Sequence, residues 1–209
     1  MNITQYDIAT GILNKVQCAD DWVNFLEQLN HRFNIQASQL LAVDLEVQAL
    51  SFSVHHGVDF DSNQLEQAAL KQIRLNVEDD PRLKKILLAP VDGWMHCSEH
   101  FSEDEILETQ IYQQVLQPLN LRFCSAIQII YDQKVCVILA FLTSPERGAL
   151  CCSELHTVYE ILPVMQQKIQ QYRHHFEYST MTLLGSQLIQ KMKQPIALIN
   201  LNGDILEIN

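Results

Sequence analysis

The stretch with the most chemical potential is Trp94-Met95-His96-Cys97, with His100 three residues further on. An indole and an imidazole beside a loop can line a pocket for a small ligand. Imidazole and thiolate also bind zinc, but one loop supplies too few ligands for a metal site. We therefore predict that Trp94 and His96 line a ligand pocket and that no metal is bound. In the simpler interpretation, Trp94 fills the core and His96 is an ordinary hydrogen-bonded residue.

Two apolar runs, residues 121–131 and 135–142, predict the clearest strand pair, with Asp132-Gln133 as the tight turn. Because side chains alternate along a strand, the odd-numbered residues should share one face of this hairpin. We expect that face to line the same pocket, although an apolar strand face is more often plain core. The candidate ligand-binding residues are thus Trp94, His96, Phe101, Tyr112, Phe123, Ile127 and Phe141.

The six cysteines include no CxxC pair, so the usual zinc-ribbon and thioredoxin spacings are missing. Cys151-Cys152 precedes a predicted helix start and offers a thiol pair for redox sensing, with inert exposed thiols as the alternative. The sequence also contains no glycine-rich phosphate loop, no GxSxG elbow and no HExxH motif. We predict a protein that is not an enzyme, with no catalytic residues and no cofactor.

Composition favours a globular chain with one sizeable core. Of its 209 residues 47% are hydrophobic, and the net charge is −11, which disfavours a nucleic-acid-binding surface. The first ten residues lack the features of a signal peptide, and no apolar run approaches the roughly 18 residues of a membrane helix. These features predict a cytoplasmic location without membrane contact.

The spacing of apolar residues predicts alternating helices and strands. Antiparallel strands with interspersed helices are typical of an α+β sandwich. The N-terminal and C-terminal helices are expected on one face of the sheet, and the other helices around a pocket on the opposite face. The expected helices cover residues 3–16, 19–33, 61–75, 80–90 and 103–117, and the expected strands lie within residues 40–54, 94–98, 121–142 and 196–208.

A longer helix is predicted from Ser153 to Lys193, with Ser153 as its N-cap and a kink or restart at Pro163. Its apolar residues step by three or four, which suits a partner helix as in a coiled coil. We therefore predict a homodimer formed through this helix. The predicted dimerisation residues are Leu162, Met165, Ile169, Tyr172 and Phe176.

Several segments resemble the sensory regions of LuxR-type helix-turn-helix regulators. They are Asp80-Pro81-Arg82, Trp94 to Ser98, and Ile111 to Leu121, which is similar to an FYxExLxPxG-like segment before a strand hairpin. Leu162-Pro163-Val164-Met165 stands where the family has an L-PHL form, with valine and methionine departing from it. The last residues, Ile196 to Asn209, resemble the first hairpin of a PAS-like module.

This resemblance, which spans roughly Asp80 to Asn209, implies a GAF/PAS-like antiparallel sheet flanked by helices, followed by a long C-terminal signalling helix. It divides the chain into a GAF-like sensory domain (1–152), a linker and dimerisation helix (153–193) and the start of a truncated PAS-like segment (194–209). It also implies control of transcription, with an unknown small-molecule ligand and with DNA reached only through a domain absent from this sequence. The alternatives are a dimerisation or interaction scaffold without a ligand, and a metal- or redox-responsive switch using Cys97 or Cys151.

Overall fold

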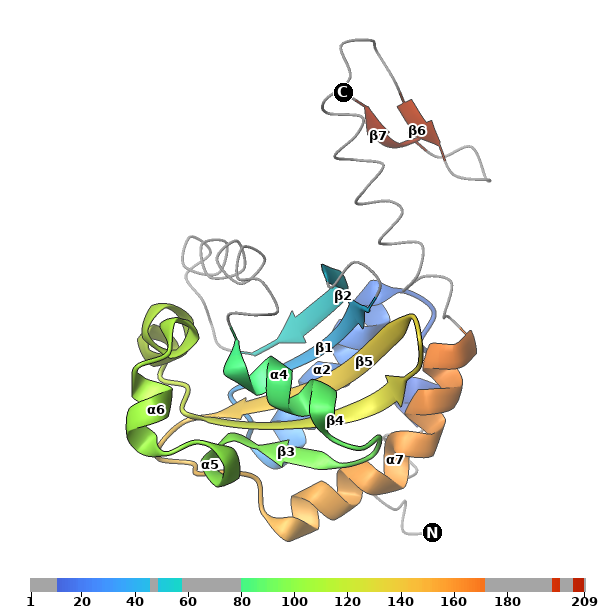
Figure 1. Cartoon of the computed structure of the whole chain (residues 1–209). Helices are drawn as coiled ribbons and strands as arrows, with labels where there is room; N and C mark the ends of the chain where they lie inside the picture. Colours follow the sequence, from blue (N-terminus) through green and yellow to red (C-terminus); the bar gives the residue numbers. More distant parts are fainter. Residues whose placement is uncertain (1–10, 46–48, 58–79, 172–196, 200–204, 209) are drawn as a thin grey trace, which may run out of the picture.

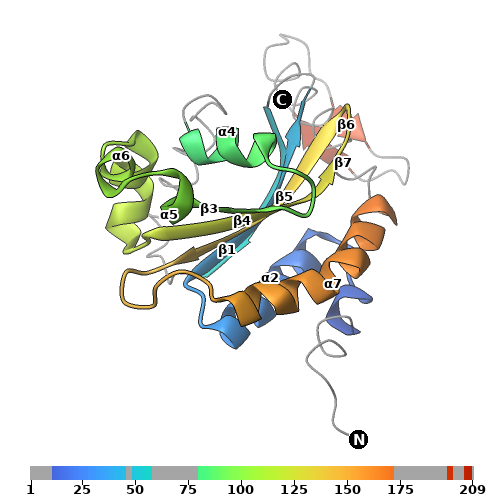
Figure 2. The same ribbon diagram turned by 60° about the horizontal axis from the view of Figure 1, so that its bottom comes forward.

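The computed structural model describes residues 11–45, 49–57, 80–171, 197–199 and 205–208. Its body is a five-stranded antiparallel sheet with helices on both faces (Figures 1 and 2), as predicted for the α+β fold. The strand order is β2-β1-β5-β4-β3. The strands are β1 (Ala37–Asp44), β2 (Ala49–His56), β3 (Trp94–His96), β4 (Phe123–Tyr131) and β5 (Val135–Thr143).

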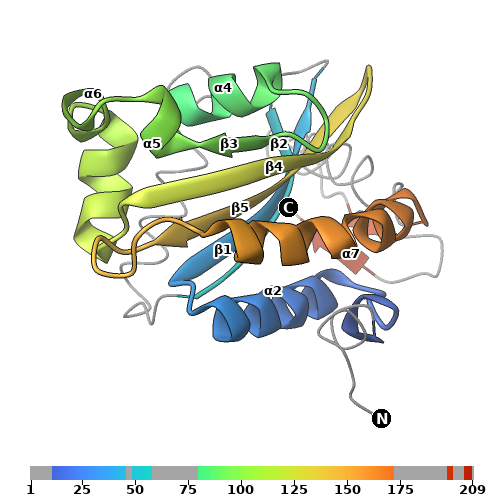
Figure 3. The same cartoon turned by 90° about the horizontal axis from the view of Figure 1, so that it is seen from below.

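Helices α2 (Ala19–Phe33) and α7 (Cys152–Gln171) lie side by side on one face of the sheet (Figure 3). This confirms the predicted packing of the early and late helices on a common face. Both helices contribute residues to one buried apolar cluster with the sheet. Its members include Trp22, Phe25, Leu26, Leu29, Val158, Ile161, Leu162, Met165 and Ile169.

The opposite face carries several short helices. These are α4 (Pro81–Leu88), α5 (Cys97–His100), α6 (Glu103–Leu107), the π-helix η1 (Tyr112–Leu116) and the 3-10 turn η2 (Gln117–Leu119). A second apolar cluster fills the space between these helices and the sheet. The two faces therefore have separate cores.

Helix α6 begins with a capping box. The Ser102 hydroxyl accepts a hydrogen bond from the Glu105 amide at 3.3 Å, and the Glu105 carboxylate accepts one from the Ser102 amide at 2.8 Å. The predicted single helix from Glu103 to Gln117 is wrong, since α6 ends at Leu107. The Thr109 hydroxyl donates to the Ile106 carbonyl at 2.7 Å, and such side-chain bonds compete with the regular helical ladder.

Helix α7 begins one residue earlier than predicted, and Ser153 is not its cap. The Glu154 carboxylate accepts a hydrogen bond from the Cys151 amide at 2.7 Å, which satisfies one backbone donor at the helix start. Pro163 lies inside α7 without ending it. The ribbon bends along its length (Figures 1 and 3), as a missing hydrogen-bond donor allows.

The C-terminal hairpin is also confirmed. Strands β6 (Ala197–Ile199) and β7 (Ile205–Ile208) pair antiparallel, with Ala197 opposite Ile208. Residues 200–204, between these strands, lie outside the described residues, as do the predicted helix over 61–75, most of the predicted helix over 3–16, and residues 172–193 of the predicted long helix. None of the described helices is both long enough and apolar enough to cross a bilayer.

Candidate ligand-binding site

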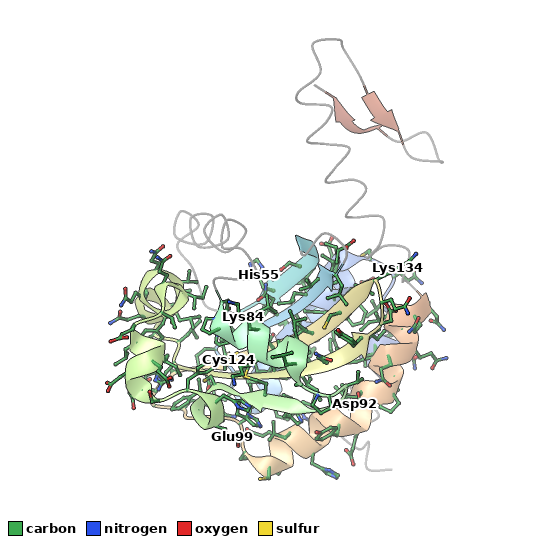
Figure 4. All side chains as sticks on the ribbon, viewed as in Figure 1. His55, Lys84, Asp92, Glu99, Cys124 and Lys134 are labelled. Carbon is green, nitrogen blue, oxygen red and sulfur yellow. The ribbon has the colours of Figure 1, made fainter. Side chains whose placement is uncertain are left out.

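A pocket lies among the short helices of the α4 face, with Arg122, the residue before β4, in its lining. The empty space within it, open solvent included, is about 280 Å³. Figure 4 shows the surroundings, with Lys84 on α4 and Cys124 on β4 beside that helix. The residues that line the pocket are Pro81, Arg82, Cys97, Phe101, Ile106, Thr109, Ile111, Tyr112, Leu116 and Arg122.

The apolar part of the lining comes mainly from the segment before and within η1. Ile111, Tyr112 and Leu116 are all buried, and Phe101 is half-buried at the end of α5. A π-turn widens the helix locally, and such turns often occur at functional sites. The pocket therefore offers a hydrophobic wall of branched and aromatic side chains.

The first polar feature of the pocket is an ion pair at the start of α4. Arg82 donates to Asp80 through Nε at 3.0 Å and through Nη2 at 2.7 Å. Asp80 also accepts a hydrogen bond from the Arg82 amide at 2.9 Å, so it caps α4. Burial disfavours ionisation of the Asp80 carboxyl, but the charge and hydrogen bonds of Arg82 outweigh it and hold the pKa of Asp80 below its usual value. This pair is satisfied within the protein.

The second polar feature, Arg122, is only partly satisfied. Its side chain is 9% exposed, and its Nε and Nη2 atoms each lie 3.2 Å from one oxygen of Glu103. Its Nη1 atom is buried and finds no acceptor among the described residues. Leaving a buried donor unsatisfied costs about 1–3 kcal/mol. The guanidinium of Arg122 can therefore donate further hydrogen bonds through Nη1.

Two thiols lie beneath these arginines. The Cys124 amide donates to the Cys97 sulfur at 3.1 Å, and both residues are buried. Burial raises the pKa of the Cys124 thiol to about 12, so this thiol is protonated at neutral pH and is a poor nucleophile. Cys151 and Cys152 are exposed. Within the described ranges, no group of three or more potential ligands is arranged to hold a metal ion.

The seven residues predicted to line the pocket are divided between the two faces of the sheet. Phe101 and Tyr112 line it. Ile127 and Phe141 belong to the core beneath α2 and α7 instead. The expectation of a single shared pocket is therefore wrong, because the odd-numbered residues of β4 and β5 face α2 and α7.

The remaining three predicted residues also lie outside the pocket lining. The Trp94 ring stacks on His96 at 5.8 Å and approaches Phe141 at 6.2 Å and Tyr159 of α7 at 6.0 Å. His96 also shares a hydrogen bond with the Ser125 hydroxyl at 2.9 Å. Phe123 is half-buried, with the Arg122 guanidinium 5.2 Å from its ring centre. None of the three lines the pocket.

The residues of β4 and β5 that face α4 are even-numbered, and several of them are small. Cys124, Ala126 and Ala140 all belong to the cluster on the α4 face. Small side chains leave room between a sheet and its covering helices, so their even spacing was the available signal for the correct face. Arg122 lies two positions before Cys124 and four before Ala126. Because side chains alternate along a strand, this spacing was the signal that Arg122 lies on the same face as those two residues.

Three of the five predicted dimerisation residues are buried in this chain's own core. Leu162, Met165 and Ile169 are 3%, 0% and 1% exposed. These three residues pack against the sheet. The prediction that they form an interface with a partner helix is therefore wrong. Tyr172 and Phe176 lie outside the described residues.

No protein-family model matches the sequence, and no curated protein matches it. Solved structures share its fold. The VqsR LBD domain from Pseudomonas aeruginosa is 11% identical over 81% of this chain and 97% of that one, with a TM-score of 0.60. The N-acylhomoserine lactone dependent LuxR family transcription factor CepR2 from Burkholderia cenocepacia is 9% identical over 80% and 92%, with a TM-score of 0.55.

A GAF domain gives a comparable match. The GAF domain of a phosphoenolpyruvate-protein phosphotransferase from Coxiella burnetii is 11% identical over 80% of this chain and 92% of that chain, with a TM-score of 0.54. At such identities the likeness concerns the fold alone. The chain therefore has a GAF-like α+β fold, shared with ligand-binding domains of LuxR-type regulators.

Proposed function

We propose that this chain is a small-molecule-sensing regulatory region of a LuxR-type transcriptional regulator, which signals to a DNA-binding domain outside this sequence. The observation that carries the proposal is the pocket among α4, α5, α6 and η1. It lies on the face opposite α2 and α7, so a ligand would meet one helical layer and leave the other free for output. The ligand-binding and regulatory domains with the same fold support this assignment.

The charges in the pocket favour binding over catalysis. Arginine stays protonated at every physiological pH, so Arg82 and Arg122 cannot act as general acids or bases. Asp80, the carboxylate paired with Arg82, is already ionised and hydrogen-bonded. Such groups orient a ligand and do not transfer protons.

A homodimer remains part of the proposal, formed by surfaces other than the buried stripe of α7. The segment after Gln171 is the natural place for it, because the sequence continues there with the Tyr172 and Phe176 steps of the same periodic pattern. Ligand binding would change how this segment meets its partner.

The test is a thermal-shift screen of the full chain against a metabolite library. A ligand that binds the native state raises the melting temperature in a dose-dependent manner. Phe101→Trp adds volume at the pocket wall and should weaken binding of any such ligand at least fivefold. The matched control is Phe52→Trp, the same change at a half-buried phenylalanine that packs against the core on the other face. Equal effects of both variants, or no stabilising compound, would contradict the proposal.

A further inference from the structure

Arg122 is a buried cation in a fixed position. Its backbone amide donates to the Thr143 carbonyl at 2.8 Å, which anchors the residue at the start of β4. Its side chain is held from two sides, by the Glu103 carboxylate and by the ring of Phe123. A guanidinium held in this way loses little conformational freedom when a ligand binds it.

Arg122 retains binding capacity that Arg82 lacks. Arg82 is bound bidentately by Asp80, whose side chain is 19% exposed. Glu103, the partner of Arg122, is 72% exposed, so solvent screens much of its charge. The Nη1 atom of Arg122 carries two N–H groups with no acceptor among the described residues. Of the two arginines that line the pocket, Arg122 is the one suited to a second anionic partner.

The rest of the lining defines the remainder of the ligand. Ile106, Ile111 and Leu116 provide apolar surface in the same pocket as Arg122, which suits a short apolar body. Guanidinium groups pair well with planar carboxylates. A phosphate dianion would bring more charge than one partly neutralised guanidinium balances.

We propose that the pocket selects molecules with a short apolar body and a carboxylate, and that Arg122 binds this carboxylate through Nη1. The inference rests on the proposed sensing function and narrows it to a class of ligand. Glu103 can keep its contacts with Nε and Nη2, so ligand binding adds a partner to Arg122 without breaking an existing ion pair.

The experiment compares three probes of equal chain length on the full chain: hexanoate, hexanamide and hexyl phosphate. Affinities are measured by calorimetry, and the guanidinium of Arg122 is followed by nitrogen-15 NMR. Hexanoate should bind at least tenfold more tightly than the other two and should shift the Arg122 side-chain resonances. Arg122→Gln should lower hexanoate affinity at least tenfold while changing hexanamide affinity less than twofold.

Two further variants separate the anchoring role from a structural one. Glu103→Gln removes a competing negative charge and should tighten hexanoate binding about twofold to fivefold, which a merely structural Arg122 would not produce. Arg122→Lys keeps the positive charge but loses the planar guanidinium, and it should weaken hexanoate binding at least threefold. This variant provides a test if Arg122→Gln does not fold. Arg32→Gln on α2, on the other face, is the matched control and should leave affinity unchanged.

Three results would overturn the inference: hexanoate binding no better than hexanamide or hexyl phosphate, insensitivity of hexanoate to both Arg122 variants, or binding of library compounds but of none of the three probes. The proposed sensing function fails separately, when no library compound binds at all. A third outcome is that Phe101→Trp blocks hexanamide binding and hexanoate binds no more tightly than hexanamide. That result would support the proposed sensing function and contradict the role of Arg122 in binding a carboxylate.

Discussion

At the residue scale, two arginines in one pocket have different roles because their partners differ in burial. Asp80 and Arg82 are both shielded from solvent, at 19% and 14% exposure, and they satisfy each other and the first turn of α4. Arg122 is equally buried, but its partner Glu103 lies in solvent. Arg82 therefore shapes the pocket, while Arg122 is available to bind.

The structural role of the first pair predicts the effect of Asp80→Asn. Removing one member of a largely buried ion pair, together with a helix cap, should lower the free energy of unfolding by about 3 kcal/mol at pH 7. The pKa of Asp80 is lowered in the folded state. Its contribution is therefore present above the unfolded-state pKa, near 4, and is lost as pH falls below that value.

The measurement is urea unfolding of the wild type and Asp80→Asn between pH 2 and pH 7. The difference between the two proteins should shrink as the pH falls from 7 towards 2 and the Asp80 carboxylate is progressively protonated. Asp20→Asn, at an exposed position in the first turn of α2, should cost no more than about 1 kcal/mol. A difference that is the same at pH 2 as at pH 7 would show that the Asp80 charge does not stabilise the fold.

At the element scale, the sequence predicted strands and their alternation but not which helical layer each face would meet. Both faces of β4 and β5 are apolar, so periodicity alone cannot distinguish them. Ile127 and Phe141 are larger than Ala126 and Ala140, their neighbours in sequence, and the larger set packs under α2 and α7. The large strand residues suggested a pocket, but they fill the core under α2 and α7.

Helix α7 shows the same ambiguity in another form. A stripe of apolar residues spaced by three and four fits a partner helix as well as a sheet. Here the sheet is the partner of Leu162, Met165 and Ile169. The existence and approximate start of the helix followed from its residues, but the identity of its partner depended on the tertiary arrangement.

This assignment predicts the outcome of Met165→Ala. Met165 is fully buried, so truncation should leave a cavity and lower the free energy of unfolding by about 2–5 kcal/mol. Sedimentation of the folded variant should show the oligomeric state of the wild type. Gln167→Ala, at an exposed position on the same helix, should change stability by no more than about 0.5 kcal/mol. Dissociation of a dimer into stable monomers by Met165→Ala would instead support the original coiled-coil hypothesis.

At the scale of the whole molecule, a turn around Asp92 connects the two helical layers past the β3 edge of the sheet. The Tyr159 hydroxyl of α7 donates to the Asp92 carbonyl at 2.8 Å, and the Gln166 amide donates to the Asp92 carboxylate at 2.9 Å. The same turn follows α4, whose first residues line the pocket. The layering could be predicted from the order of elements, but this link could not, because it joins side chain and backbone 67 residues apart.

The two hydrogen bonds from α7 to Asp92 predict how much α7 stabilises the turn after α4. Each of these hydrogen bonds should contribute about 0.5–1.5 kcal/mol. The double variant Tyr159→Phe, Gln166→Ala should therefore speed hydrogen exchange at the Asp92 amide, which donates to the Gln128 carbonyl at 3.1 Å, by about tenfold.

Exchange along α4 should rise in the same double variant, since the turn restrains its C-terminal end, while the central strands β1 and β5 keep wild-type protection. The control Thr157→Ala removes a hydroxyl that donates to the Ser153 carbonyl within α7, and it should leave the Asp92 amide unchanged. A uniform rise across all strands would indicate global destabilisation, and no rise at Asp92 would show that the layers are mechanically independent. A selective rise would identify the Asp92 turn as the physical connection through which movement of α4 reaches α7, as the proposed signalling from the pocket requires.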